Sequence, residues 1–191
     1  LSENEKFSSI CKENGINFIG PDSEIINLMG NKSLAKDTMQ KVGVPTIPGS
    51  EGNVRTYEEA KYLCDSIGYP VIVKAASGGG GKGMRLANSE LELEKSFKMA
   101  KIEAGASFSD ENVYIEKYLK DPRHIEIQIL CDAFGNIIPL GERECSLQRR
   151  HQKLLEESPS CVMDDTLREK LYKSSIKACE AVKYLGAGTI E

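Results

Sequence analysis

A run of four glycines, Gly78 to Gly81, separates two apolar segments and limits what this part of the chain can form. The β-branched run Val71 to Val73 is typical of a buried strand, and Lys74 follows it directly. Met84 to Ala87 predicts a second short strand. Because glycine has no side chain, the N–H groups of such a loop can come close to a ligand. With Lys74 and Lys82 at its ends, the loop predicts a glycine flap over a polyphosphate.

Two familiar glycine motifs do not describe this loop. Gly78, Gly80 and Gly83 fit the letters of a dinucleotide-binding fingerprint, but that fingerprint needs a helix directly after the loop. Here the next residues are strand-like. A phosphate-binding loop ending in Gly-Lys-Ser/Thr is also excluded, because Gly83 follows Lys82. A flexible surface turn is the remaining alternative to a flap.

Further motifs extend the pattern along the chain: EKYL at 116–119, PRHIEIQ at 122–128, ERECS at 142–146, QRRHQK at 148–153 and GAGTIE at 186–191. With VIVKAASGGGGKGMR at 71–85, they resemble the ATP-grasp enzymes and specifically the biotin carboxylases, in the same order and spacing. QRRHQK is more specific than the glycine run. The resemblance covers essentially all 191 residues and is strongest to the biotin carboxylase subunit of bacterial acetyl-CoA carboxylase.

Composition excludes several classes of function. The formal net charge of −4 argues against binding to nucleic acid or to an anionic membrane surface. No apolar run approaches the roughly 20 residues of a membrane span, and no signal peptide is visible. The six cysteines are scattered without a C-x-x-C pair, which argues against a zinc site. A reduced, cytoplasmic setting is therefore expected.

Capping boxes mark two of the helices. Thr56 with Glu59 is expected to begin one helix, which Gly68 ends, and Ser89 with Glu92 is expected to begin another. A third, long helix is expected over 165–185. The residues predicted to face the core are Ala60, Leu63, Cys64 and Ile67 in the first helix, Leu93, Phe97, Ala100 and Ala104 in the second, and Leu167, Leu171, Ala178 and Val182 in the third.

The first two of these helices, set against a few strands over roughly 46–118, predict a small α+β sandwich, so we predict an α+β protein. Strict alternation over 123–131, a turn at 132–136 and a return over 137–143 predict a hairpin, with Ile125, Ile127 and Ile129 on one face and His124, Glu126 and Gln128 on the other. The loop 146–160 is expected to be ordered. The other expected elements are helices over 4–13, 23–29 and 32–42 and strands over 17–19, 71–73, 84–87 and 113–116.

The resemblance implies an ATP-grasp fold divided in four parts. These are the tail of an N-terminal α/β domain (1–20), a helical linker (21–45), a small lid domain with the glycine flap (46–118) and the first part of a larger sheet domain (119–191). The chain does not begin with Met, and its last residues look like the start of a strand. We therefore expect an internal fragment of a longer enzyme, itself without biotin carboxylase activity.

The resemblance also implies which residues bind the nucleotide. They are Lys32, Lys74, the flap glycines Gly80 and Gly81, the adenine hinge Glu116, Lys117, Tyr118 and Leu119, and His124, Gln148 and His151. The residues by themselves leave simpler alternatives open. Lys74 could be a surface lysine, the hinge an ordinary linker, and the polar stripe of the hairpin a half-solvated sheet face. The basic cluster around His151 could be a solvated loop or an RNA contact, although no aromatic residues are interleaved with it.

Catalytic roles follow from the same resemblance. It places Lys153 and Glu126 beside bicarbonate, where the lysine charge can offset negative charge that develops during phosphoryl transfer. Glu191 is implied to bind Mg²⁺ or Mn²⁺, which take hard oxygen donors. Cys145, beside this pocket, is expected to be a packed thiol and not a nucleophile.

The function implied for the parent enzyme is ATP-dependent carboxylation of biotin, a ligase reaction that uses bicarbonate and passes through carboxyphosphate. The implied partners are a biotin carboxyl carrier protein, a carboxyltransferase component and a second copy of the parent, in fatty acid biosynthesis. Alternatives are the biotin carboxylase domain of a pyruvate, propionyl-CoA or methylcrotonyl-CoA carboxylase, another ATP-grasp ligase such as carbamoyl-phosphate synthetase, or a non-catalytic nucleotide-binding module.

Overall fold

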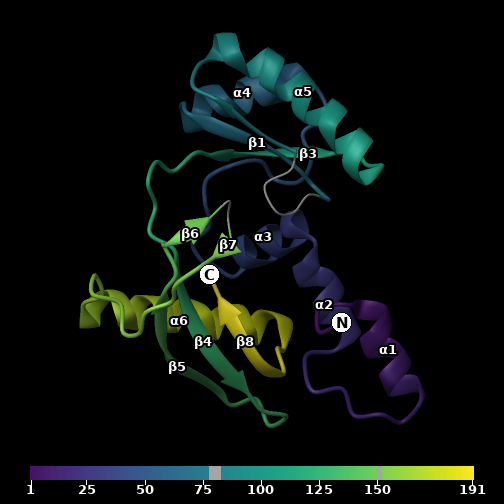
Figure 1. The fold of residues 1–191 in the computed structure, drawn as a ribbon, viewed down its shortest axis with the longest axis vertical. Coiled ribbons are helices and arrows are strands. Elements are labelled where there is room, and N and C mark those ends of the chain that lie inside the picture. The colour runs from purple at the N-terminus through teal and green to yellow at the C-terminus, as the bar shows by residue number, and fades with distance from the viewer. Residues whose placement is uncertain (78–82, 150–151) are drawn as a thin grey trace.

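The described part of the chain forms two three-stranded antiparallel sheets, each covered by helices, and one short two-stranded sheet (Figure 1). The structure is a computed structural model that describes residues 1–77, 83–149 and 152–191, without the side chains of 32 and 33. The helices are α1 (Glu5–Glu13), α2 (Ser23–Gly30), α3 (Lys32–Lys41), α4 (Tyr57–Ile67), α5 (Glu90–Phe108) and α6 (Asp165–Val182). The strands are β1 (Val71–Ala75), β2 (Met84–Ala87), β3 (Val113–Lys117), β4 (Ile125–Cys131), β5 (Ile137–Glu144), β6 (Gln148–Arg149), β7 (Gln152–Lys153) and β8 (Gly186–Ile190).

The first sheet has the order β2-β1-β3, with α4 and α5 above it (Figure 1). The predicted capping box at Thr56 and Glu59 is present, and Gly68 ends α4 with a φ of +74°. The stripe Leu93, Phe97, Ala100 and Ala104 is buried against the strands, together with Ala60 and Cys64 of α4. Burial of this apolar face is what holds the two helices on the sheet, because helical propensity alone stabilises helices of this length only marginally.

The second sheet has the order β5-β4-β8, and α6 packs on one of its faces. Ile127, Ile129 and Cys131 of β4 meet Cys179 of α6 in its core. The hairpin turn is closed by Asp132, whose carboxylate accepts hydrogen bonds from the backbone N–H groups of Phe134 and Asn136. The face of the sheet opposite α6 carries the polar residues of the site.

A β-bulge changes the register of this hairpin. Near the turn Ile129 pairs with Pro139, but further along Ile127 pairs with Glu142, so β5 has one residue more than β4 between these pairs. Gly141 lies in the bulge with a φ of +117°, a backbone conformation that residues other than glycine rarely adopt. Beyond the bulge, Glu126 pairs with Arg143.

The N-terminal helices connect the two sheets. α1 packs on α2, α2 on α3, and α3 on α6. In Figure 1, α3 lies between the upper and the lower sheet. Lys36 of α3 also reaches Glu116 of β3, so this helix contacts both units. Among the helices that the structure describes, none has both the length and the apolar character needed to cross a bilayer.

Most predicted elements are present, and five details differ. No strand forms over 17–19, where Ile19 is 93 % exposed and no neighbouring strand pairs with it. The Ser89 side chain makes no capping hydrogen bond; Glu92 instead accepts from the N–H and the side-chain amide of Asn88. Leu167 is exposed instead of inward-facing. The helix predicted over 165–185 ends at Val182, and the loop 146–160 contains the short strands β6 and β7.

Core packing in α5 gives a direct test of this fold. Replacing Leu93, which is completely buried, with Ala should lower the free energy of unfolding by about 2–5 kcal/mol, because it removes apolar burial and leaves a cavity. Leu91, on the same helix, is 94 % exposed, so Leu91→Ala should change it by less than about 0.5 kcal/mol. Urea unfolding followed by circular dichroism measures both, and equal effects would contradict the assigned face.

Candidate functional site

One charged cluster joins the first sheet to α3. Lys74 stands at the end of β1, and its Nζ donates to Glu116 Oε2 on the neighbouring strand at 2.7 Å. The other oxygen, Oε1, accepts from Lys36 Nζ at 3.3 Å. Glu116 and Lys36 are largely buried, with side chains 12 % and 9 % exposed. Two ammonium groups thus share one carboxylate, so these three side chains carry a net charge of +1.

The segment 116–119 leads out of the first sheet, and the N–H groups of its two central residues donate hydrogen bonds. Lys117 N–H donates to Pro48 O at 2.8 Å, and Tyr118 N–H donates to Pro70 O at 3.0 Å. The Lys117 side chain also turns back, donating to the carbonyls of Gly68 and Tyr69. Among the described residues, no acceptor receives the N–H of Leu119. Leu119 is therefore the hinge position that has a backbone donor available for a ligand.

A second charged cluster lies on the second sheet, where Lys153 bridges two carboxylates. Its Nζ donates to Glu126 Oε2 and, at 2.6 Å, to Glu191 Oε1. Glu126 is on β4, Lys153 on β7, and Glu191 follows β8 directly. The β4–β8 register pairs Ile127 with Ile190, so the next residues, Glu126 and Glu191, come opposite each other. Lys153 separates two negative charges that would otherwise repel.

Arg143 holds the other oxygen of Glu126. Its Nε donates to Glu126 Oε1 at 2.6 Å, its Nη2 contacts the same oxygen, and its Nη1 donates to Gln128 Oε1 at 2.9 Å. Glu156 lies 3.3 Å from Nε but is half-exposed. The Glu126 side chain is only 2 % exposed. A carboxylate buried to this degree needs both of its cationic partners to stay charged.

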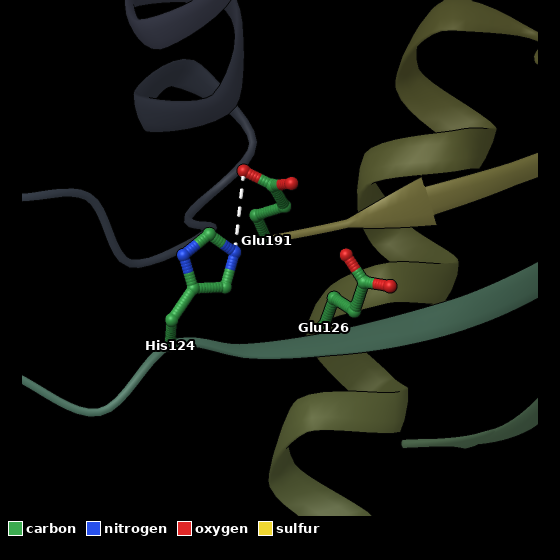
Figure 2. Close-up of side chains that lie close together, drawn as sticks. All are labelled: His124, Glu126 and Glu191. Carbon is green, nitrogen blue, oxygen red and sulfur yellow. Dashed lines mark ion pairs between the residues drawn. The ribbon is translucent and has the colours of Figure 1, made fainter. Parts of the chain in front are cut away.

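His124 lines the same site from the start of β4. Figure 2 shows its imidazole facing the Glu191 carboxylate, with Glu126 further along the strand. Nε2 lies 3.5 Å from Glu191 Oε2, but it is buried and makes no hydrogen bond with any described residue. Nδ1 lies 2.8 Å from Gln148 Nε2, and Gln148 also donates to Cys145 O. Gln148 thus fixes the orientation of the ring and leaves Nε2 for a ligand.

The pKa directions agree with these contacts. Burial raises the pKa of the Glu126 carboxyl, but hydrogen bonds from Lys153 and Arg143 outweigh it and hold that pKa below its usual range. Burial likewise opposes the charge of Lys153, yet its hydrogen bonds to Glu126 and Glu191 raise its pKa well above the ordinary value. Burial raises the pKa of the Cys145 thiol, so it is protonated and unsuited to act as a nucleophile.

Glu191 has the donor chemistry that a magnesium ion requires. His124, Glu126 and Glu191 each offer an atom within 4.8 Å of one another. The Glu191 side chain is 53 % exposed and presents carboxylate oxygens, the ligand type that Mg²⁺ prefers. Glu126 fits a direct ligand less well, because one of its oxygens is bonded to Arg143 and the other to Lys153.

The structure brings together five of the predicted site residues: Glu126, Lys153, His124, Gln148 and Glu191. Lys74 and the hinge lie in the other cluster, and no ion pair between described residues links the two clusters. Gly80, Gly81 and His151 lie outside the described residues, as does the side chain of Lys32. The sequence analysis did not identify Lys36 or Arg143 as site residues. Gly141, a glycine inside a strand, was the available indication of the bulge that positions Arg143.

Known proteins are similar to this chain over its whole length. The family model described as "Carbamoyl-phosphate synthase L chain, ATP binding domain" matches residues 31–191. A biotin carboxylase from Nostoc sp. is 59 % identical over 191 residues, all of this chain and 43 % of that protein. The chain therefore spans about two fifths of the length of such relatives.

Solved structures agree with these relatives. A biotin carboxylase–beta-gamma-ATP complex from Campylobacter jejuni is 54 % identical with a TM-score of 0.92, covering 99 % of this chain and 42 % of that one. The biotin carboxylase domain dimer of Hydrogenobacter thermophilus 2-oxoglutarate carboxylase, with MgADP, ADP and bicarbonate, is 46 % identical with a TM-score of 0.91, covering 99 % and 42 %. The resemblance seen in the motifs and the expected ATP-grasp fold are thus confirmed.

Glu126→Gln should lower the free energy of unfolding by about 1–3 kcal/mol at pH 7, because Arg143 and Lys153 lose a buried, charged partner. The folded pKa of Glu126 lies below that of the unfolded chain. Its stabilisation is therefore present above the unfolded carboxyl pKa and is lost as pH falls through the folded value. Wild type and variant should converge only when the pH is below the folded pKa of Glu126, as urea unfolding at several pH values can show.

Glu169 is a matched control, since its side chain is 72 % exposed in an i,i+4 pair with Lys173. Glu169→Gln should change the free energy of unfolding by less than about 0.5 kcal/mol at any pH. A pH-independent difference between wild type and Glu126→Gln would contradict the assigned charge state.

Proposed function

This chain belongs to the family of carbamoyl-phosphate synthase L chain ATP-binding domains, and we propose that in its parent protein it supplies the nucleotide-binding side and part of the bicarbonate-binding side of a biotin carboxylase. The observation that carries the proposal is the placement of Lys153. This ammonium donates to Glu126 of β4 and to Glu191 after β8, and the Glu191 carboxylate also lies 3.5 Å from His124 Nε2. Similarity to biotin carboxylases along the whole chain supports it.

On the nucleotide side, Lys74 supplies positive charge for the phosphates. Its Glu116 partner is already shared with Lys36, so the cluster carries one uncompensated positive charge. The adenine edge would be read by the backbone at the hinge, where no described residue accepts a hydrogen bond from Leu119 N–H. The glycine flap, which includes Gly80 and Gly81, would cover the phosphates, with Lys32 as a further phosphate contact. His124, Gln148 and His151 would complete the nucleotide site.

On the bicarbonate side, the reaction places negative charge next to Lys153. Bicarbonate oxygen attacks the γ-phosphorus of ATP, the bond from phosphorus to the β-bridging oxygen breaks, and ADP leaves as carboxyphosphate forms. An ammonium held in place offsets the charge that spreads over the transferring group. Glu126 orients Lys153 and keeps it protonated. Mg²⁺, held in part by Glu191, would neutralise phosphate charge when bound.

The later steps involve groups outside this chain. Carboxyphosphate would release CO₂ to biotin on a carrier protein, and a carboxyltransferase component would pass the carboxyl group on. We propose acetyl-CoA as the final acceptor, in fatty acid biosynthesis, with pyruvate, propionyl-CoA and methylcrotonyl-CoA as alternatives. A cytoplasmic homodimer is the proposed state of the parent. The domain division at 20, 45 and 118 belongs to the same proposal.

Substitution of the two lysines should separate the two sides of the site. In the full-length parent, Lys74→Ala should weaken ATP binding by about 1.5–3 kcal/mol, the range for a charge-assisted hydrogen bond. Lys153→Ala should act mainly on the KM for bicarbonate and on kcat. The measurements are ATP binding by calorimetry and steady-state release of ADP with bicarbonate and free biotin varied.

Lys173 serves as the control, because its side chain is 72 % exposed on α6 and lies in neither cluster. Lys173→Ala should leave both measurements unchanged. Equal losses of ATP affinity in Lys74→Ala and Lys153→Ala, with bicarbonate kinetics unchanged, would contradict this division of roles. Absence of bicarbonate-dependent ADP release in the wild-type parent would contradict the function itself.

A further inference from the structure

We propose that Arg143 is a positioning residue for bicarbonate, acting through Glu126 to limit the negative charge around Lys153. The inference rests on the proposed function and assigns a role to a residue that touches Glu126 but makes no ion pair with Lys153 itself. Arg143 contacts Glu126, Gln128 and Glu156, and it makes no ion pair with Lys153 or Glu191.

The contacts divide the Glu126 carboxylate between two cations. Oε1 receives Arg143, and Oε2 receives Lys153. Because Arg143 also donates to Gln128 Oε1, its guanidinium is fixed at two points on β4. Gln128 in turn donates to Gly188 O at 2.8 Å, which ties the arrangement to β8. Glu126 is therefore held in one orientation, with Oε2 directed toward Lys153.

The β-bulge is what makes this pairing possible. Near the turn the paired residues are Cys131 with Ile137 and Leu130 with Ile138. Continued without interruption, that register would place Glu126 opposite Glu142, two like charges on one face. The extra residue at Gly141 replaces Glu142 with Arg143 at this position, and Glu142 turns to the other face, where it pairs with Arg168 of α6.

Arg143 lowers the negative charge that an anionic substrate meets near Lys153. Lys153, Glu126 and Glu191 together carry a net charge of −1, and Arg143 brings this group to zero. Glu156 and Glu191 have side chains 44 % and 53 % exposed, so solvent screens both in part; with Glu156 included, the group carries −1 with Arg143 and −2 without it. Without Arg143, the Lys153 ammonium would be outweighed by its two carboxylates, and the approach of bicarbonate would be opposed.

A second buried ion pair on the same hairpin, between Arg168 and Glu142, can distinguish a purely structural role of Arg143 from a role at the bicarbonate site. Arg168 and Glu142 have side chains 27 % and 2 % exposed, almost the values of Arg143 and Glu126, at 28 % and 2 %. Both carboxylates are on the same hairpin, but the Arg168 pair faces α6, away from Lys153. Loss of either arginine should cost similar stability. Only loss of Arg143 should change the charge at the bicarbonate site.

The experiment uses the full-length parent protein with Arg143→Met, Arg143→Gln, Arg143→Lys and Arg168→Met. Bicarbonate-dependent ADP release gives KM for bicarbonate, KM for ATP and kcat, and thermal unfolding gives stability. Arg143→Met and Arg143→Gln should raise KM for bicarbonate about tenfold to a hundredfold, with KM for ATP within about twofold. Arg143→Lys restores the charge and should recover most of the loss. Arg168→Met should leave both KM values within about twofold.

Arg143→Gln keeps a hydrogen-bond donor for Glu126, so it reports the charge effect even if Arg143→Met does not fold. A KM for bicarbonate that is unchanged in Arg143→Gln, or raised equally by Arg168→Met, would overturn the inference while leaving the proposed function intact. Equal increases in Arg143→Lys and Arg143→Gln would also overturn it. A wild-type parent without bicarbonate-dependent ADP release would overturn the proposed function and this inference with it.

Discussion

The buried carboxylate of Glu126 is the interaction on which the candidate site depends. It is 2 % exposed, and its two oxygens are bound by Arg143 and Lys153, which come from different strands. An isolated carboxylate at this depth would be protonated or would destabilise the fold. Held between two cations, it stays charged and fixes Lys153 in turn. The position of Lys153 between β4 and the end of β8 follows from this one group.

In the first sheet, too, a largely buried carboxylate is held between two cations, but there the balance of charge is the opposite. There one carboxylate, Glu116, serves two lysines, Lys36 and Lys74, so the excess is positive. In the second sheet one lysine serves two carboxylates, and Arg143 offsets one of these negative charges. The first arrangement suits a polyphosphate and the second a small anion next to a metal ion. Lys36 comes from α3, which also packs on α6, so one helix contacts both the first sheet and the helix that covers the second sheet.

Local patterns in the sequence predicted much of the fold and part of the site. The stripe of Leu93, Phe97 and Ala100 identified α5, because helical periodicity reports directly which face is buried. Alternation over 123–131 placed His124, Glu126 and Gln128 on the same side of a strand. The strand expected at 17–19 failed because a strand needs a partner, and that partner is a property of the tertiary structure. Leu167 failed for a related reason: it lies in the first turn of α6, whereas the α6 residues in the core of the sheet, Leu171, Tyr172 and Cys179, come later in the helix.

The sequence by itself determined the mixed architecture, the glycine loop between two strands and the motifs that identify the family. Only the tertiary structure decided which charges meet. The bulge at Gly141 shifts the register of β5 by one residue and brings Arg143 to Glu126 instead of Glu142. The approach of α3 to β3 brings Lys36 to Glu116 across 80 residues of sequence. Both depend on contacts between segments whose spacing along the chain carries no information about their register or distance, because that is fixed by packing and by how buried charges find partners.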